Sequence, residues 1–409
     1  MVGRNRNTSG FKPSLSILSS SVIIALILLL TDEDNTAFSF TPMAVPLASS
    51  STTSLSSANS MARDLLHQDQ QAAMESRALF EQTLLQKKKS KELKAPKLHI
   101  KQAIPGTGFG GGASKVNPKV QLAMEQAKVI HRDGVLRIDQ ALTPELADEL
   151  REYVLQQQIF AATKTDENLE SSQAFYGVEN QRKSRCDLQL SLLRGGYEAD
   201  GNANMSGQKH ILADALQELL GEDGTLRFIY EELVTLKGEF YEMAAIITDP
   251  GSTRQKIHPD LPFKDHSPLY VIFLALQDVN ESMGPTSFLL RTHTAKGNDT
   301  FKDQSQEVRD EQLSTADCRI STLKKGDAVL FDARILHCGN ANDLENGSNR
   351  ALFNFSFRNP KISGDLGYKG SIRPGYAQAM SLGDISDALG AYGDGRDKDP
   401  FAKYGDGLR

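Results

Sequence analysis

The sequence has few cysteines and no tryptophan. Its 409 residues include only Cys186, Cys318 and Cys338, which form no C-x-x-C pair. Three cysteines are too few for a disulfide scaffold or a thiolate zinc site, so we expect packing to stabilise the fold. Because Trp is absent and 7% of residues are aromatic, the composition does not suggest a platform for stacking bases or sugars.

Positive charge is not in excess either. The chain has 46 Lys and Arg against 52 Asp and Glu, which gives a net charge of −6. Sequence-independent binding of nucleic acid requires clustered Lys and Arg, so DNA or RNA is not an expected partner. With 39% apolar residues, the chain is long enough for one large domain or two ordinary ones.

A long apolar run is also missing. Residues 17–30 are apolar but shorter than the ~20 residues of a membrane-spanning helix, so they resemble the core of a signal peptide. We therefore expect no stable membrane span in the mature chain. Residues 35–62 are rich in Ser and Thr without Asp or Glu, which is typical of a transit peptide. The two parts in series resemble the bipartite presequences of algae with secondary plastids. This resemblance implies delivery to a plastid, and secretion or an endomembrane location is the alternative.

The chain is predicted to have four parts. They are a targeting segment (1–42), a Ser-rich transit-like stretch with a solvated helix and a Gly-rich linker (43–118), a folded domain (119–376) and a flexible Gly- and Asp-rich tail (377–409). The solvated helix is expected over residues 61–94, which contain no Gly or Pro.

Within the folded domain, helices precede strands. A helix from Thr143 to about Gln158 follows from a Thr-Pro-Glu start and apolar residues every four positions. Alternating or apolar runs predict strands at 134–138, 185–192, 243–247, 269–276, 327–331 and 350–358. This order predicts an α+β fold whose β part is a sandwich or small barrel.

One His-x-Asp triplet stands where strands are expected. His258 and Asp260 follow a predicted strand, and residues two apart on an extended chain share a face, so both side chains can converge on one ion. His337 ends another predicted strand and is the expected third ligand. Two imidazoles and one carboxylate form the facial triad of non-haem Fe(II) oxygenases, although zinc hydrolases use a related ligand set.

Arg350 favours the oxygenase interpretation. A keto acid that chelates iron has a second carboxylate, which a guanidinium can hold with two hydrogen bonds. The alternative is that Arg350 pairs with Asp343 or Glu345 on the surface. Arg358 shares the strand face by parity and is the second candidate for this role.

Further polar residues are candidates for the same site. We expect Gln255 and Thr286 beside the co-substrate, and Arg254 beside the substrate; turn residues such as Gln255 and Arg254 could instead hydrogen-bond the backbone. Arg185, Asp187 and Gln189 occupy one face of a predicted strand, and we assign Arg185 and Gln189 to the substrate pocket if that face turns inward.

Three ordered motifs carry a family resemblance. They are Asp249 to Asp260, Met283 to Phe288, and Gly326 to His337 with Arg350. In these segments the chain resembles the phytanoyl-CoA dioxygenase family of Fe(II)- and 2-oxoglutarate-dependent oxygenases. The resemblance implies a double-stranded β-helix, which is a cupin-like jelly-roll, with flanking helices. It makes residues 119–376 the oxygenase domain.

The resemblance also assigns roles to single residues. It implies that His258, Asp260 and His337 bind Fe(II) and that Arg350 holds 2-oxoglutarate, with O2 as the other co-substrate. Two positions depart from the family pattern: Gly339 stands where some members have a serine that contacts the co-substrate, and of a Pro-Gly-Ser-His motif only His293 is kept. We expect His293 to be structural.

The predicted function is hydroxylation of a small organic molecule, such as a lipid, an acyl-CoA or a small metabolite, with release of succinate and CO2. Related iron halogenases replace the carboxylate ligand by a small residue, whereas Asp260 is retained here, which favours hydroxylation. The alternatives are a cupin-like metal isomerase or hydrolase and a non-catalytic relative that binds a ligand.

Overall fold

The computed structural model describes the part of the chain that carries the predicted site. The described residues are 91–98, 117–167, 184–196, 209–301, 305, 308, 311, 315–367, 370–394 and 399–404. They fall within one of the chain's two units, which spans Met74–Arg409, while the other spans Met1–Ala73. The predicted targeting segment, most of the transit-like stretch, the predicted helix up to residue 90 and the Gly-rich linker lie outside the described residues.

Six strands form the larger of two sheets. Their order is β2 (Val135–Ile138), β8 (Ala328–Asp332), β5 (Leu269–Ala275), β10 (Arg350–Arg358), β4 (Glu239–Thr248) and β3 (Arg185–Gln189). All neighbours in this sheet are antiparallel. The register places Thr248 of β4 opposite Arg350 on one side and Arg185 on the other. The predicted strands of the domain are therefore confirmed, with ends that differ by a few residues.

The smaller sheet has the order β1 (Lys91–Glu92), β7 (Cys318–Ile320), β6 (Thr286–Leu289) and β9 (His337–Gly339). β6 pairs antiparallel with both β7 and β9, whereas β1 pairs parallel with β7. Buried side chains from both sheets, such as Val271, Phe288 and Phe331, form one apolar cluster between them. The fold is thus α+β with a double-stranded β-helix core, as predicted, although the two sheets do not close into a barrel.

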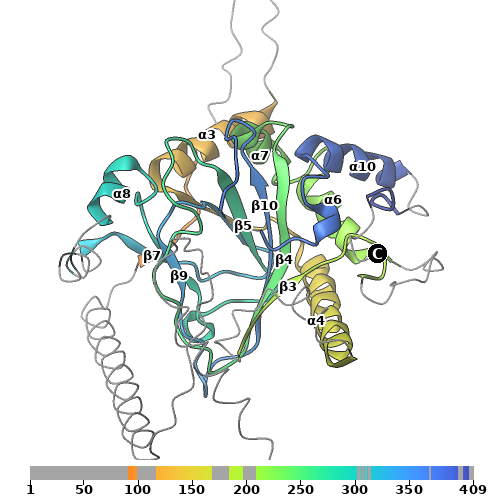
Figure 1. The fold of residues 1–409 in the computed structure, drawn as a ribbon, viewed down its shortest axis with the longest axis horizontal. Coiled ribbons are helices and arrows are strands. Elements are labelled where there is room, and N and C mark those ends of the chain that lie inside the picture. The colour runs from red at the N-terminus through yellow and green to blue at the C-terminus, as the bar shows by residue number, and fades with distance from the viewer. Residues whose placement is uncertain are drawn as a thin grey trace, which may run out of the picture. The chain divides into compact units, whose positions relative to one another are not determined.

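Helices cover the other face of the larger sheet. They are α3 (Pro118–Asp133), α4 (Pro144–Glu167), α6 (Ile211–Leu220), α7 (Arg227–Val234) and α10 (Leu382–Asp394), and a shorter helix, α8 (Ala295–Phe301), follows β6. Figure 1 shows α4, α6 and α10 beside β3 and β4, with β7 and β9 on the opposite side. Two 3-10 turns, Glu281–Met283 and Pro374–Tyr376, complete the elements of the described residues.

The alternation of β10 explains how one strand serves both layers. Phe353, Phe355 and Phe357 belong to the cluster shared with the helices, and the Tyr230 ring of α7 lies 4.8 Å from the Phe357 ring between centroids. The alternate positions, which include Arg350 and Leu352, point into the space between the sheets. Alternating polar and apolar residues are typical of a half-buried strand, but nearly all of β10 is buried, because helices cover one face and the smaller sheet covers the other.

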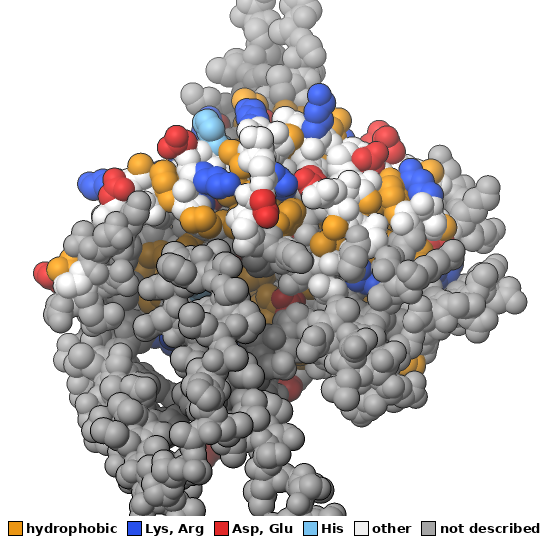
Figure 2. All heavy atoms as spheres, in the orientation of Figure 1, with side chains coloured by type: hydrophobic (Ala, Val, Ile, Leu, Met, Phe, Trp, Pro, Cys, Tyr) orange, Lys and Arg blue, Asp and Glu red, His pale blue; other side chains and the backbone are white. Residues whose placement is uncertain are grey.

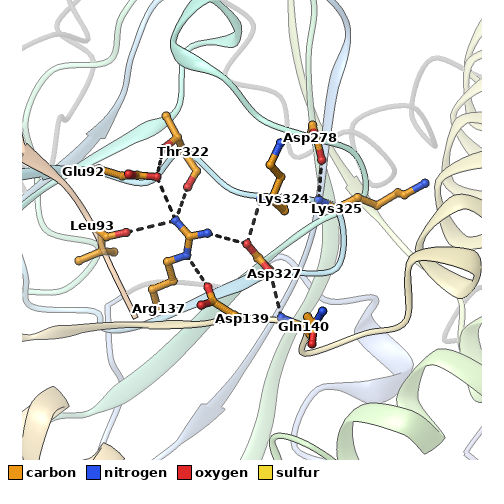
Figure 3. A network of polar contacts seen from close by, with 10 residues as sticks. All are labelled: Glu92, Leu93, Arg137, Asp139, Gln140, Asp278, Thr322, Lys324, Lys325 and Asp327. Atoms are coloured by element: carbon orange, nitrogen blue, oxygen red, sulfur yellow. Dashed lines mark hydrogen bonds and ion pairs between the residues drawn. The ribbon is translucent and has the colours of Figure 1, made fainter. Parts of the chain in front are cut away.

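A network of polar contacts fastens the short strand β1 to the domain (Figure 3). The Arg137 guanidinium donates to the Leu93 and Thr322 carbonyl oxygens and forms an ion pair of 2.7 Å with Asp327. Asp327 also accepts hydrogen bonds from the backbone nitrogens of Gln140 and Lys324. The last residues of the predicted helix at 61–94 are therefore a strand, since Lys91 and Glu92 find backbone partners on β7.

The prediction of a flexible tail at 377–409 is wrong for its described residues. Helix α10 occupies Leu382–Asp394, and Leu382, Ile385 and Leu389 are fully buried against the domain. The Ser381 hydroxyl accepts a hydrogen bond from the Asp384 backbone nitrogen, and the Asp384 carboxylate accepts one from the Ser381 backbone nitrogen. This reciprocal capping begins the helix despite the high Gly and Asp content.

Two further observations concern the described surface. No helix among the described residues is both long enough and apolar enough to cross a membrane. Figure 2 shows acidic and basic side chains interspersed over the described part of the face in view. That part of the surface carries no broad field of a single charge.

Candidate active site

Two histidines are held together by backbone hydrogen bonds. The His258 backbone nitrogen donates to the His337 carbonyl oxygen over 3.0 Å, and the reverse hydrogen bond measures 2.9 Å. This isolated antiparallel bridge joins the loop after β4 to β9 at the edge of the smaller sheet. Their ring centroids are 4.7 Å apart as a result.

Asp260 completes the group. Its Oδ1 atom lies 3.8 Å from His258 Nε2 and 3.5 Å from His337 Nε2. The Asp260 backbone nitrogen donates to the Ala333 carbonyl oxygen, which fixes this turn of the chain against the end of β8. The three candidate ligand atoms all lie within 4.8 Å of one another, so the group could hold a metal ion.

Hydrogen bonds set the orientation of both rings. His258 Nδ1 lies 2.7 Å from the Lys256 carbonyl oxygen, and His337 Nδ1 lies 3.0 Å from the Ile335 carbonyl oxygen. A carbonyl oxygen only accepts, so each Nδ1 carries the proton and each Nε2 presents its lone pair toward Asp260. This is the tautomer that a metal ligand requires.

Burial tunes the charge of the group. His337 is 4% exposed and packs between the rings of Phe288 and Phe331. Burial lowers the pKa of His337 to about 4, so this imidazole is neutral at ordinary pH. Burial raises the pKa of Asp260 to about 6, and the charge of His258 opposes that rise. Without a metal, the site therefore holds a carboxylate that is costly to ionise.

Arg350 is a buried cation. It is 2% exposed, and its guanidinium donates to the Gly284 carbonyl oxygen and, over 3.1 Å, to the Thr248 hydroxyl. Its Nε atom has no hydrogen-bond partner, and within the described ranges no carboxylate forms an ion pair with it. Burial and the nearby Arg185 lower the pKa of Arg350 to about 9. The predicted surface pairing with Asp343 or Glu345 is not present.

The group formed by His258, Asp260 and His337 lines one cavity of about 430 Å³ together with Arg350. Arg185, Gln255 and Thr286 also line it, as predicted for residues near the co-substrate or substrate. The Gln255 side-chain oxygen accepts a hydrogen bond of 2.7 Å from the Gly339 backbone nitrogen. The predicted site residues thus come from both sheets and from the loop that follows β4.

Gly339 is closely covered by two of these side chains. A Cβ atom placed there would lie 2.8 Å from Gln255 Oε1 and 3.1 Å from Arg185 Nη2. The space that a serine side chain would take is therefore occupied by the Arg185 guanidinium. A glycine at position 339, where some family members have a serine, therefore leaves the space that the Arg185 side chain needs.

Three other candidates are not brought to the cavity. Gln189 and Arg254 are not among the described residues that line it, and Arg254 instead donates to the Cys338 sulfur over 3.3 Å. Arg358 lies at the far end of β10, where it bonds the Ile362 and Gly364 carbonyl oxygens. Arg358 is therefore not the co-substrate clamp. His293 Nε2 bonds the His131 carbonyl oxygen, which agrees with a structural role.

Sequence reasoning missed three polar residues of the cavity. Glu242, Asn354 and Ser371 line it together with Asp187, whose strand face we had noted. The alternation of β10 places Asn354 on the face opposite the phenylalanines, but the same pattern fits a face turned toward water, so it does not identify a cavity residue. Ser371 follows the last strand in a segment without periodicity, so no local signal pointed to it.

A family model described as phytanoyl-CoA dioxygenase matches residues 130–345. No curated protein sequence matches the chain.

Solved structures show weak similarity at low identity. The non-heme α-ketoglutarate-dependent carbocyclase SnoK from nogalamycin biosynthesis is 13% identical, with 57% of this chain and 83% of that chain covered and a TM-score of 0.40. The epimerase SnoN from the same biosynthesis is 14% identical, with 61% and 95% covered and a TM-score of 0.38. HygX from Streptomyces hygroscopicus, solved with nickel, 2-oxoglutarate and hygromycin B, is 11% identical, with 61% and 95% covered and a TM-score of 0.38.

Proposed function

The chain belongs to the phytanoyl-CoA dioxygenase family, and from this premise we propose that it is an Fe(II)- and 2-oxoglutarate-dependent hydroxylase of a small organic molecule. One observation carries the proposal. Three side chains that could hold a metal ion line the same cavity as a buried arginine with no carboxylate partner among the described residues. A metal site alone would fit several enzyme classes, whereas the arginine calls for an anionic co-substrate.

The residues fit the two groups that the family implies. Two imidazole Nε2 atoms and one carboxylate oxygen suit Fe(II), and they leave three positions of an octahedron for other ligands. The free Nε atom of Arg350 and its lack of a described acidic neighbour suit the distal carboxylate of 2-oxoglutarate. Asp260 fills the position of the carboxylate ligand, so that position is not open to a halide, which favours hydroxylation over halogenation.

Iron and 2-oxoglutarate, when bound, supply the oxidising chemistry: with O2, the co-substrate is decarboxylated to succinate and CO2, and one oxygen atom enters a C–H bond. The chain's own residues bind and orient. His258, Asp260 and His337 would hold the metal, and Arg350 would hold the distal carboxylate of the co-substrate. Thr286 and Arg185 line the same cavity and would add hydrogen bonds to the same anion.

The apolar wall has a separate task. Val271, Phe273 and Leu352 line the cavity, and Phe288 and Phe331 pack on the His337 ring. These side chains keep water away from the His337 ring and from the inner part of the cavity, which strengthens the charge interaction at Arg350.

An anaerobic titration tests the proposal. Addition of Fe(II) and then 2-oxoglutarate to the purified protein should produce a visible metal-to-ligand charge-transfer band. Arg350→Met should weaken 2-oxoglutarate binding by about 10- to 100-fold, because it removes charge-assisted hydrogen bonds.

Arg358→Met is the matched control, since Arg358 lies on the same strand outside the cavity and should leave the band unchanged. Metal binding without a band from 2-oxoglutarate would refute the proposal and favour a metal isomerase or hydrolase. A band that is equally strong in Arg350→Met would refute the role of Arg350.

A further inference from the structure

The cavity has a basic end and an acidic end. The register aligns Arg185, Thr248 and Arg350 in one row across β3, β4 and β10. Asn354 lies four residues further along β10, which is about 13 Å at 3.3 Å per residue. Asp187 and Glu242 line the cavity on the Asn354 side of this row. The basic end suits 2-oxoglutarate, so the acidic end is left for the other substrate.

The acidic end holds buried acceptor atoms without partners. Asn354 is 3% exposed, and its Oδ1 atom has no hydrogen-bond partner. Asp187 accepts a hydrogen bond of 2.5 Å from the Ser371 hydroxyl at Oδ2, while its buried Oδ1 has no partner. Buried acceptors are normally satisfied, so these two atoms are suited to donors that a ligand brings.

The charged groups that act on Asp187 are acidic. Burial, together with the nearby Glu242 and Asp260 carboxyls, raises the pKa of Asp187 to about 7, although the hydrogen bond from the Ser371 hydroxyl opposes this rise. A buried carboxylate is stabilised best by a cation placed in hydrogen-bond contact. A carboxylate or phosphate at this place would be repelled, and a plain acyl chain would leave Asp187 and Asn354 unsatisfied.

A small residue beside Asn354 leaves room for a ligand at the acidic end of the cavity. Ala244 lies opposite Asn354 on β4 and has only a methyl group. The segment that carries Ser371 lies directly on β4, because the Met243 backbone nitrogen donates to the Ser371 carbonyl oxygen over 2.9 Å. A Cβ atom at Gly370 would lie 2.3 Å from the Tyr241 carbonyl oxygen, so glycine is required for this approach. The acidic end is thus built by three strands and a fitted segment.

We propose that the substrate is a small organic amine whose ammonium group binds Asp187, while Asn354 accepts a second N–H or O–H donor of the same molecule. This assignment rests on the proposed function and names the substrate class of that site. Asp187 and Asn354 are here substrate-binding residues that orient a C–H bond toward the group formed by His258, Asp260 and His337. The cavity of about 430 Å³ must also take 2-oxoglutarate, which limits the substrate to a small molecule.

Three probes that differ only in the head group test the proposal. Cyclohexylmethylamine, cyclohexylmethanol and cyclohexanecarboxylate are titrated at pH 8 into the anaerobic protein loaded with Fe(II) and 2-oxoglutarate, and binding is read from the change in the charge-transfer band. The amine should bind at least about tenfold more tightly than the alcohol, and the carboxylate should bind most weakly. This ranking in the unmodified protein needs no variant.

Asp187→Asn should bring the amine and the alcohol within about twofold of each other, while the band from Fe(II) and 2-oxoglutarate persists. Glu239→Gln is the control, because Glu239 lies at the start of the same strand as Glu242, where it pairs with Arg358 outside the cavity. It should keep the preference for the amine.

Equal binding of amine and alcohol in the unmodified protein would overturn the inference, as would a full preference for the amine in Asp187→Asn. If the charge-transfer band forms but the preference is absent, only this inference fails. If no band forms, the proposed function fails with it.

Discussion

At the scale of single residues, the site is defined by charges that lack their natural partners. Burial raises the pKa of Asp260 and lowers the pKa values of His337 and Arg350. Each shift reflects the loss of water around a group that a metal or an anion would compensate. Burial of these groups therefore costs the protein some stability, which is common at functional sites.

The first prediction concerns pH. The pKa of Asp260 is about 6 in the folded protein without metal, against 3.8 for an unperturbed carboxyl. The protonated carboxyl therefore contributes stability that is complete below about pH 4 and is lost as the pH rises through 6. A metal needs the carboxylate, so affinity for Mn(II) should fall by about tenfold per pH unit below 6. His337, with a pKa of about 4, stays neutral through most of this range.

Calorimetric titration with Mn(II) between pH 5 and 8 measures this dependence. Asp365→Asn changes an exposed carboxyl and should behave like the unmodified protein. An affinity that stays constant from pH 5 to pH 7 would contradict the assignment of Asp260 as a ligand.

The second prediction concerns Gly339. Gly339→Ala should raise the KM for 2-oxoglutarate by roughly tenfold, because the new Cβ displaces Gln255 and Arg185 from the co-substrate space. The kcat at saturating 2-oxoglutarate should change less. Gly390→Ala is a suitable control, since no atom lies within 4 Å of a Cβ placed there. An unchanged KM in Gly339→Ala would remove Arg185 and Gln255 from the co-substrate site.

Part of the site could be predicted from the sequence, for a physical reason. His258 and Asp260 are two residues apart, so local geometry alone brings them together, and His337 and Arg350 follow from recognised motifs. Arg254 lies inside one of these motifs and Gln189 lies on an earlier predicted strand, but neither is among the described residues that line the cavity. Whether Gln189 reaches the cavity depends on where β3 ends, and whether Arg254 does depends on the path of the loop after β4 past His337. Neighbouring residues in the sequence determine neither of these.

At the scale of secondary-structure elements, periodicity predicted where the strands are, but it did not predict what covers their faces. The alternation in β10 is a genuine strand pattern, yet it could not tell a water-covered face from one that lines an internal cavity. Asn354 and Ser356 occupy the polar positions of this alternation, yet both are buried. A polar residue in a strand facing a functional cavity has the same local pattern as one facing water.

The third prediction tests helix α10. Leu389→Ala should lower the free energy of unfolding by about 2 to 5 kcal/mol, because Leu389 is fully buried against the domain. Asp387→Ala alters an exposed position of the same helix and should change it by less than about 0.5 kcal/mol. Urea unfolding measures both. Equal stabilities for the two variants would mean that this segment is not part of the core.

At the scale of the whole molecule, two sheets and one helical layer divide the work. The helices stabilise the outer face of the larger sheet, and its inner face is free to carry charged and polar groups. The α+β class and the double-stranded β-helix were predictable from the order of elements and the family motifs. The pairing of β1 with β7 could not be predicted, because a two-residue strand that precedes the predicted domain in the sequence is too short to show an alternation.

The attachment of β1 sets a limit on how far the chain can be truncated from its N-terminal side. Leu93 is buried, and Arg137 reaches across to the backbone of this segment, so Lys91 to Leu93 form the outer edge of the smaller sheet. A truncated variant that starts before Lys91 keeps this edge covered, whereas one that starts after Leu93 exposes the edge of β7 to pairing with other molecules. The shorter form should therefore melt at a lower temperature and self-associate in sedimentation experiments.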